Sequence, residues 1–173
     1  MCNTEYVHAR RIHRKEHQEW MHEALSLAQC ALDSSDVPIG ALVIASDGTI
    51  IGRGYNQREK NQDPTAHAEI IALREAAEQR GQWRLEDCTL VVTIEPCIMC
   101  AGAILLSRIS TVVLGAWEEK TGAAGSLYDV LRDRRYPHSV EVYSGVLEEE
   151  CASLMKTFFE KKRSESHGPF GRF

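Results

Sequence analysis

Residues 88–108, "CTLVVTIEPCIMCAGAILLSR", join a predicted strand to a predicted helix that carries two cysteines. The strand, 88–95, is almost continuously apolar, which is typical of a strand buried on both faces of a sheet. In the helix, 97–108, Cys97 and Cys100 are three residues apart and therefore share one face of the first turn. Free backbone N–H groups and the helix dipole favour thiolates at this end. The pair therefore has the chemistry of a metal site or a redox site.

A second motif, "PTAHAE" at residues 64–69, opens another predicted helix. If strand 88–95 is central, both helix N-termini can lie at one edge of the sheet, which would bring His67 to the two cysteines. One imidazole and two thiolates suit zinc, and an open fourth position is typical of a catalytic site. Zinc lowers the pKa of a bound water to about 7, and Glu69 is placed to take that proton without being a ligand.

The rest of the chain alternates strands and helices. This order indicates a five-stranded mixed sheet in a three-layer α/β/α sandwich. We expect one domain over 16–163, a flexible basic extension over 1–15 and a flexible tail over 164–173. The expected elements are a helix at 16–33, strands at 37–46 and 49–56 joined by an Asp-Gly hairpin, a helix at 66–81, a strand at 110–116, a Gly-rich loop at 120–126, a short helix at 127–133, a strand at 138–145 and a helix at 146–166.

Composition indicates an ordinary globular protein, with 173 residues, 43% hydrophobic and 26% charged. No apolar run approaches the roughly 20 residues of a membrane span, and the N-terminus lacks the apolar region of a secretory signal, so we expect a cytoplasmic protein without membrane contact. Nothing calls for disulfides, so the four cysteines outside the pair are interpreted as free thiols or core residues.

Charge is distributed unevenly along the chain, although the net charge is only -5. Residues 1–15 carry four basic and one acidic side chain, and residues 152–173 carry five basic and two acidic, so each end is +3. Basic ends fit a phosphate-bearing partner, or they merely keep the protein soluble.

His-x-Glu followed by Pro-Cys-x-x-Cys is an established signature of zinc nucleobase deaminases. From Trp20 to Arg163 the chain resembles the bacterial tRNA-specific adenosine deaminases. The resemblance implies the cytidine deaminase fold, a homodimer, and conversion of adenosine to inosine at the wobble position in the anticodon stem-loop of an arginine tRNA. The stretches that carry it are "DVPIGALV", "GRGYN", "DPTAHAEI", "TIEPCIMCAGAILLSRI", "KTGAAGSLYDVL" and "FFEKKR".

The same resemblance assigns roles to individual residues. It implies that His67, Cys97 and Cys100 hold one Zn²⁺ per subunit and that Glu69 is the proton shuttle. The implied substrate-binding residues are Asn56, Val37, Pro38, Ala68, Ile94 and Glu118, with Ala68 offering its backbone N–H near the base. Asn56 can also be read as a turn residue, and the apolar members as plain core. Trp117 and Glu118 depart from the Arg-Asp that relatives often carry there.

The predicted RNA-binding residues lie near the C-terminal end: Phe158, Phe159, Lys161, Lys162 and Arg163. Aromatic faces stack on bases while cations meet phosphates. The alternative is an ordinary amphipathic helix with one or both Phe side chains in the core. Residues 132–138 form a second basic segment with the same two interpretations.

Three other functions remain open at this point. A free-base guanine or cytosine deaminase would use the same zinc chemistry in a pocket closed by the C-terminal segment. A non-catalytic RNA-binding subunit would keep zinc only for structure, but it would not need Glu69. A thioredoxin-like oxidoreductase would use the cysteine pair and leave His67 and Glu69 without a role.

Overall fold

The computed structural model describes residues 15–166, and residues 1–14 and 167–173 lie outside the described part. The extension and the tail expected at the two ends fall mostly outside it, although Lys15 and residues 164–166 are already helical. The elements are α1 (Lys15–Cys30), the 3-10 helix η1 (Ala31–Ser34), β1 (Gly40–Ile44), β2 (Ile50–Tyr55), α2 (Arg58–Asn61), α3 (Ala68–Arg80), β3 (Thr89–Ile94), α4 (Ile98–Leu106), β4 (Thr111–Ala116), β5 (Glu141–Tyr143) and α5 (Glu148–Ser166).

The five strands form one mixed sheet in the order β2-β1-β3-β4-β5. β1 is antiparallel to both β2 and β3, whereas β3, β4 and β5 run parallel. β3 is central and buried along almost its whole length, as its apolar sequence predicts. The expected hairpin turn joins β1 to β2, with the Ala45 N–H donating to the Thr49 carbonyl oxygen at 2.9 Å.

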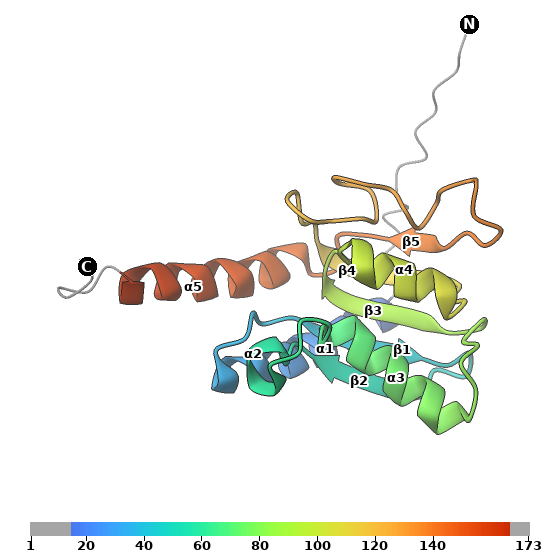
Figure 1. Ribbon diagram of the computed structural model, residues 1–173, viewed down its shortest axis with the longest axis horizontal. Helices are drawn as coiled ribbons and strands as arrows, with labels where there is room; N and C mark the ends of the chain where they lie inside the picture. Colours follow the sequence, from blue (N-terminus) through green and yellow to red (C-terminus); the bar gives the residue numbers. More distant parts are fainter. Residues whose placement is uncertain (1–14, 167–173) are drawn as a thin grey trace, which may run out of the picture.

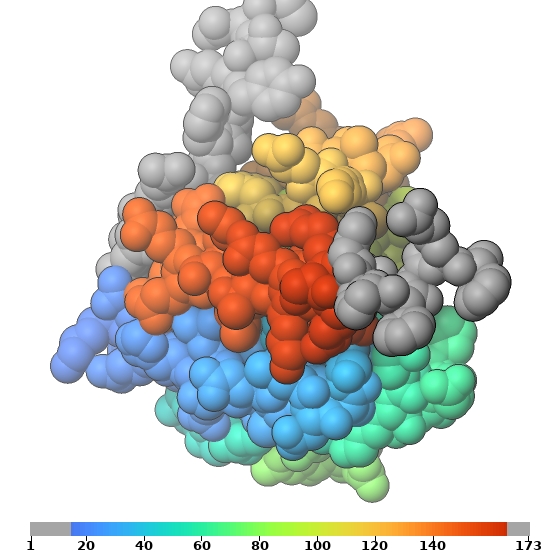
Figure 2. Space-filling view, turned by 90° about the vertical axis from the view of Figure 1, so that its left-hand side faces the viewer, coloured from blue at the N-terminus to red at the C-terminus, as the bar shows by residue number. Residues whose placement is uncertain are grey.

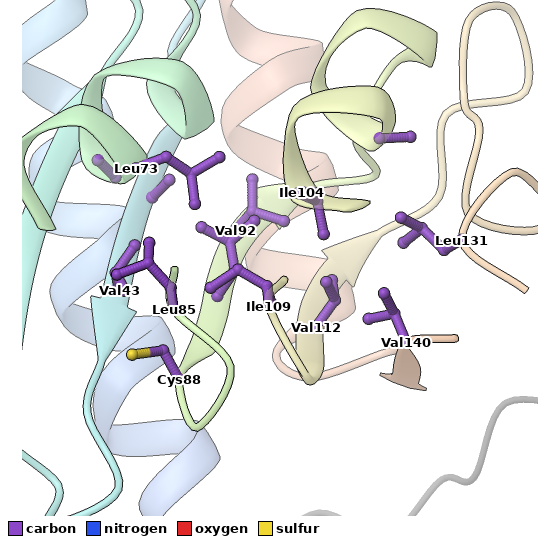
Figure 3. Close-up of a cluster of buried hydrophobic side chains, with 14 of the residues drawn as sticks. Val43, Leu73, Leu85, Cys88, Val92, Ile104, Ile109, Val112, Leu131 and Val140 are labelled. Carbon is purple, nitrogen blue, oxygen red and sulfur yellow. The ribbon is translucent and has the colours of Figure 1, made fainter. Parts of the chain in front are cut away.

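Helices cover both faces of this sheet (Figure 1). Leu90 and Val92 of β3 belong to a core cluster with α3 and α4, whereas Val91 belongs to a second cluster with α1 and α5. Figure 3 shows Leu73 of α3 and Ile104 of α4 on either side of Val92. This alternation follows from the two-residue period of a strand, and it confirms the predicted three-layer α/β/α sandwich.

Glycines in β2 let α3 lie directly on the sheet. A Cβ atom at Gly54 would overlap the carbonyl oxygen of Ala68, and one at Gly52 would overlap that of Ala72. Only glycine permits so close an approach of two backbones. The start of α3, with His67 and Glu69, is thereby held against the sheet edge.

The predicted short helix at 127–133 is wrong, because this segment folds as a turn-rich loop. Its backbone donors bond to the preceding loop instead of to residues four positions back. Tyr128 N–H donates to the Gly122 carbonyl oxygen at 3.1 Å, and Val130 N–H donates to that of Ala123 at 3.0 Å. With these donors already paired, no helical ladder forms.

A four-residue helix, α2, was not expected from the sequence. The buried Asp36 carboxylate holds its start by accepting the backbone N–H groups of Glu59 at 2.8 Å and Lys60 at 3.2 Å. These hydrogen bonds hold the pKa of Asp36 below its usual value, against the raising effect of burial. Asp36 thereby ties the segment before β1 to the segment after β2.

Among the described residues, no helix combines the length and the apolar character that crossing a membrane needs.

Candidate metal centre and substrate cavity

The predicted ligands from two distant motifs meet at one edge of the sheet. His67 stands immediately before α3, Cys97 stands immediately before α4, and Cys100 lies in the first turn of α4. His67 Nδ1 is 3.6 Å from Cys97 Sγ and 3.5 Å from Cys100 Sγ. Their ligand atoms all lie within 4.8 Å of one another.

These distances fit a tetrahedral zinc site. Zn–S bonds of about 2.3 Å and Zn–N bonds of about 2.05 Å at tetrahedral angles separate nitrogen from sulfur by about 3.6 Å. The donor set is also the borderline-soft combination of imidazole and thiolates that zinc prefers. Since three side chains converge, a fourth coordination position is left for a non-protein ligand.

Proton sharing between the two cysteines prepares the site for a metal. A hydrogen bond from Cys100, supported by His67, lowers the pKa of Cys97 to about 3. The same bond and burial raise the pKa of Cys100. Contact with Cys97 also raises the pKa of His67. The directions of these shifts favour a thiolate at Cys97, and metal binding to a thiol releases its proton.

Glu69 is a buried carboxylate beside these ligands, with 3% of its surface exposed. Its Oε2 atom has no hydrogen-bond partner within residues 15–166. Burial raises the pKa of Glu69 to about 7. A buried acid with an unsatisfied oxygen and a pKa near neutrality is suited to moving protons for a ligand.

The site opens into a cavity of about 160 Å³. Several predicted substrate-binding residues line it, and so do residues that the sequence analysis missed. The expected ones are Val37, Asn56, Ile94, Glu118 and Phe159, together with His67, Glu69 and Cys97; the missed ones are Ile39, Arg58, Glu95, Thr121 and Met155.

Asn56 is oriented by the start of α3. Its Oδ1 accepts the backbone N–H of Ala68 at 3.0 Å, which satisfies one of the free donors of that helix end. Its Nδ2 donates to no other residue of the described chain, so two N–H donors are available to a ligand in the cavity.

Two of the predicted substrate-binding residues, Ala68 and Pro38, do not line the cavity, and their contacts with a base stay predictions. The Ala68 N–H, expected near the base, is donated to Asn56 because a helix N-terminus needs an acceptor. Pro38 is buried and does not line the cavity, whereas its neighbours Val37 and Ile39 do.

The two adjacent phenylalanines of α5 have different environments. Phe158 is only 8% exposed and belongs to the buried core, whereas Phe159 is 43% exposed and lines the cavity. The two environments differ because helical geometry turns consecutive side chains by about 100°. Contact of Phe158 or Phe159 with RNA stays a prediction. Phe159 and Met155 are four residues apart, and this spacing in the sequence indicates that both lie on one side of α5.

The predicted basic residues lie beyond the cavity along α5. Lys161 and Lys162 line a separate groove between α5 and the η1 region, and Arg163 is exposed near the end of the helix. Lys162 Nζ lies 5.2 Å from the centroid of the Phe158 ring. Figure 2 shows α5, in red, lying across the blue segments from the first part of the chain.

An α/β/α domain with this group of side chains and a neighbouring acid is typical of the zinc-binding nucleobase deaminases. Residues 14–116 match the family model for the cytidine and deoxycytidylate deaminase zinc-binding region. The chain belongs to the family of bacterial tRNA-specific adenosine deaminases, within the cytidine deaminase superfamily.

Two curated relatives illustrate the extent of this similarity. The tRNA-specific adenosine deaminase of Streptococcus pyogenes serotype M18 (strain MGAS8232) is 49% identical over 149 residues, which cover 86% of this chain and 93% of the relative. The tRNA-specific adenosine deaminase of Bacillus subtilis (strain 168) is 47% identical over 146 residues, 84% of this chain and 90% of the relative.

Solved structures agree with this assignment. A structure from a study of A-to-I editing by tRNA:A34 deaminases at the wobble position has a TM-score of 0.75 and 41% identity, covering 79% of this chain and 98% of that one. A guanine deaminase from Nitrosomonas europaea has a TM-score of 0.69 and 25% identity, covering 86% of each chain. The family and fold rule out the thioredoxin-like alternative.

Proposed function

We propose that the protein is a zinc-dependent hydrolase that converts adenosine to inosine at the wobble position of the anticodon of an arginine tRNA. The observation that carries this proposal is the buried Glu69 carboxylate, with an unpartnered oxygen, beside the His67–Cys97–Cys100 cluster. A purely structural zinc site would have no need of a buried acid whose pKa is raised to about 7.

The chain's own residues account for binding and proton transfer. His67, Cys97 and Cys100 would hold the zinc ion, which when bound would lower the pKa of water to about 7. Glu69 accepts one proton from the water that attacks C6 of adenine and passes this proton to N1. Glu69 then takes the remaining proton from the new hydroxyl group on C6 and delivers it to the amino group, which leaves as ammonia when the C6–N bond breaks and the C6 carbonyl group forms. Asn56 donates hydrogen bonds that orient the target nucleotide.

The shape of the site favours a base presented by RNA. A free-base enzyme would need the C-terminal segment to close the pocket. In the described part of that segment, α5 projects away from the sheet as far as Ser166 (Figure 1). Only Met155 and Phe159 of α5 line the cavity. A base in an anticodon loop is already unpaired, so it can be turned into such a cavity at low cost. Phe159 would stack on a base while Lys161 and Lys162 meet phosphates.

The decisive experiment supplies an arginine tRNA with adenosine at the wobble position and measures inosine. A matched tRNA with guanosine at that position, and one whose only loop adenosine lies elsewhere, are the substrate controls. Glu69→Gln is the enzyme control, since it keeps the size of the side chain and leaves the ligands intact. Ammonia release from free guanine or cytosine, without inosine in tRNA, would establish the free-base deaminase instead.

We further propose one zinc ion per chain and a cytoplasmic location, because three ligands converge at one site and tRNA is a cytoplasmic substrate. Elemental analysis of the purified protein tests the stoichiometry. A ratio well below one zinc per chain in fully active protein would contradict it.

The homodimer is proposed from the family resemblance and from one exposed surface. Ile98 and Leu106 of α4 are 59% and 66% exposed, and both lie on one side of the helix because they are eight residues apart. Trp83 is exposed nearby, beside an apolar groove that includes Leu106. Light scattering should give twice 19.4 kDa. Leu106→Glu should shift the protein toward monomer, whereas a monomeric wild type at micromolar concentration would refute the proposal.

A further inference from the structure

Glu95 is a second buried acid at the cavity, and the proposed chemistry does not use it. Its carboxylate accepts backbone N–H groups from Glu118 at 3.0 Å, Ala124 at 2.9 Å and Ser126 at 3.1 Å. The Ser126 hydroxyl donates a further hydrogen bond to the same carboxylate. All four donors belong to the loop of residues 118–126, which we call the substrate loop.

The substrate loop is also joined to the turn that carries the cysteine ligands. Ala123 N–H donates to the Pro96 carbonyl oxygen at 2.8 Å, and Gly122 forms an isolated antiparallel bridge with Cys97. A Cβ atom at Gly122 would overlap Glu95 Oε2 and the Ser126 hydroxyl. The glycine is therefore required for the carboxylate to lie inside the loop.

Two residues of the substrate loop, Glu118 and Thr121, line the cavity. Their positions depend on the loop conformation, and the loop conformation depends on Glu95. Hydrogen bonds to an ionised carboxylate are stronger than those between neutral groups. By contrast, Glu69 and His67 lie at the start of α3, which is held by the sheet and the core.

We propose that Glu95 is a positioning residue that holds the substrate loop in its nucleotide-binding conformation and thereby sets substrate affinity. This inference rests on the proposed function, because its effect is measured with the RNA substrate. Without the carboxylate the loop would have to be ordered when the substrate binds, and that ordering lowers affinity. Proton transfer in the bound complex would be largely unaffected.

Glu95→Gln is the direct test because the amide keeps the size but replaces one acceptor oxygen with a donor. The amide nitrogen of the glutamine would face backbone N–H groups, and it cannot accept hydrogen bonds from them. We expect KM for the tRNA stem-loop to rise about 10- to 100-fold, as follows from losing a hydrogen bond to a charged group. We expect kcat to stay within a few-fold of the wild type. Glu86, an exposed acid outside the substrate loop, provides the matched control, and Glu86→Gln should leave KM unchanged.

Two further variants approach the same contact from the loop. Gly122→Ala introduces the overlapping Cβ and should reproduce the rise in KM. Ser126→Ala removes the side-chain donor and should have a smaller effect. In the double variant Glu95→Gln/Ser126→Ala, the change in binding free energy should be smaller than the sum of the two single changes, because both substitutions remove the same contact.

Hydrogen exchange gives a readout that does not depend on activity. The amides of Glu118, Ala124 and Ser126 should exchange faster in Glu95→Gln, whereas amides of β3 should keep their protection. A fall in kcat with unchanged KM would mean a loss of active protein and would overturn the proposal, as would unchanged amide protection. A wild-type protein that forms no inosine would refute the proposed substrate instead, so the two failures are distinguishable.

Discussion

Replacing each of the two adjacent phenylalanines of α5 by alanine should separate stability from substrate binding. Truncating a buried Phe to Ala typically costs 3–5 kcal/mol. Phe158 is 8% exposed and lies beside the groove between α5 and η1, so we expect the lower end of this range, about 3 kcal/mol. For a domain of this size that corresponds to a fall in Tm of about 6–12 °C.

Phe159 should behave in the opposite way. It is 43% exposed, and its ring packs edge-on against Phe158 at 5.3 Å between ring centroids. Phe159→Ala removes this aromatic pair and should lower the free energy of unfolding by about 0.5–1.5 kcal/mol, which corresponds to a fall in Tm of only a few degrees. Losing a base-stacking face costs about 1–3 kcal/mol, so KM for tRNA should rise roughly 5- to 150-fold.

The assay combines thermal unfolding, followed by circular dichroism, with steady-state inosine formation. Phe159→Tyr retains the ring and should keep both the Tm and the KM near the wild-type values. The reasoning fails if Phe159→Ala lowers the Tm more than Phe158→Ala does. It also fails if Phe159→Ala leaves KM unchanged at normal stability.

Four further outcomes are expected. Glu69→Gln should reduce inosine formation by at least about 10²–10⁴-fold in single-turnover assays while zinc content, measured by elemental analysis, stays the same. Removal of zinc by a chelator should abolish activity, and added zinc should restore it; activity in zinc-free protein would contradict the proposed centre. Replacing Lys161 and Lys162 by Ala should weaken tRNA binding and flatten its dependence on salt in a titration series, because fewer counterions are released. The ion pair with Arg80 lowers the pKa of Asp87 to about 2, so the pair stabilises the fold above the ordinary pKa of Asp. This contribution is lost as the pH falls toward 2. Between the ordinary pKa of Asp and pH 2, urea unfolding should therefore show a smaller loss of stability for Asp87→Asn than for the wild type.

The sheet and the residues that cluster at its edge were predictable because they depend on local patterns. A nearly continuous apolar run indicated β3, and the His-x-Glu and Pro-Cys-x-x-Cys spacings indicated the four side chains that the structure brings together. Each of these signals lies within a few residues, so no knowledge of distant contacts was needed.

The parts that the sequence did not reveal depend on distant contacts. The loop at 127–133 has helical composition, but its N–H groups bond to Gly122 and Ala123 instead. Glu95 reads as a charge at the end of a strand until the substrate loop folds around it. The different exposures of Phe158 and Phe159 depend on how α5 packs against the rest of the chain; the four-residue spacing of Met155 and Phe159 indicates a shared side of α5 but not what this side faces.

The origin of the proposed zinc ligands in two separate helix starts has a consequence for the order of assembly. Of the three, Cys97 and Cys100 are close together in the sequence, whereas His67 reaches them through pairing of β2 with β1 and of β1 with β3. A tridentate site exists only in the folded sheet, so zinc binds the folded state more tightly than the unfolded one and stabilises it by mass action. Tight binding of zinc should therefore begin only when β1 has paired with β3, a strand far from it in the sequence. During unfolding, loss of zinc should coincide with separation of β1 from β3.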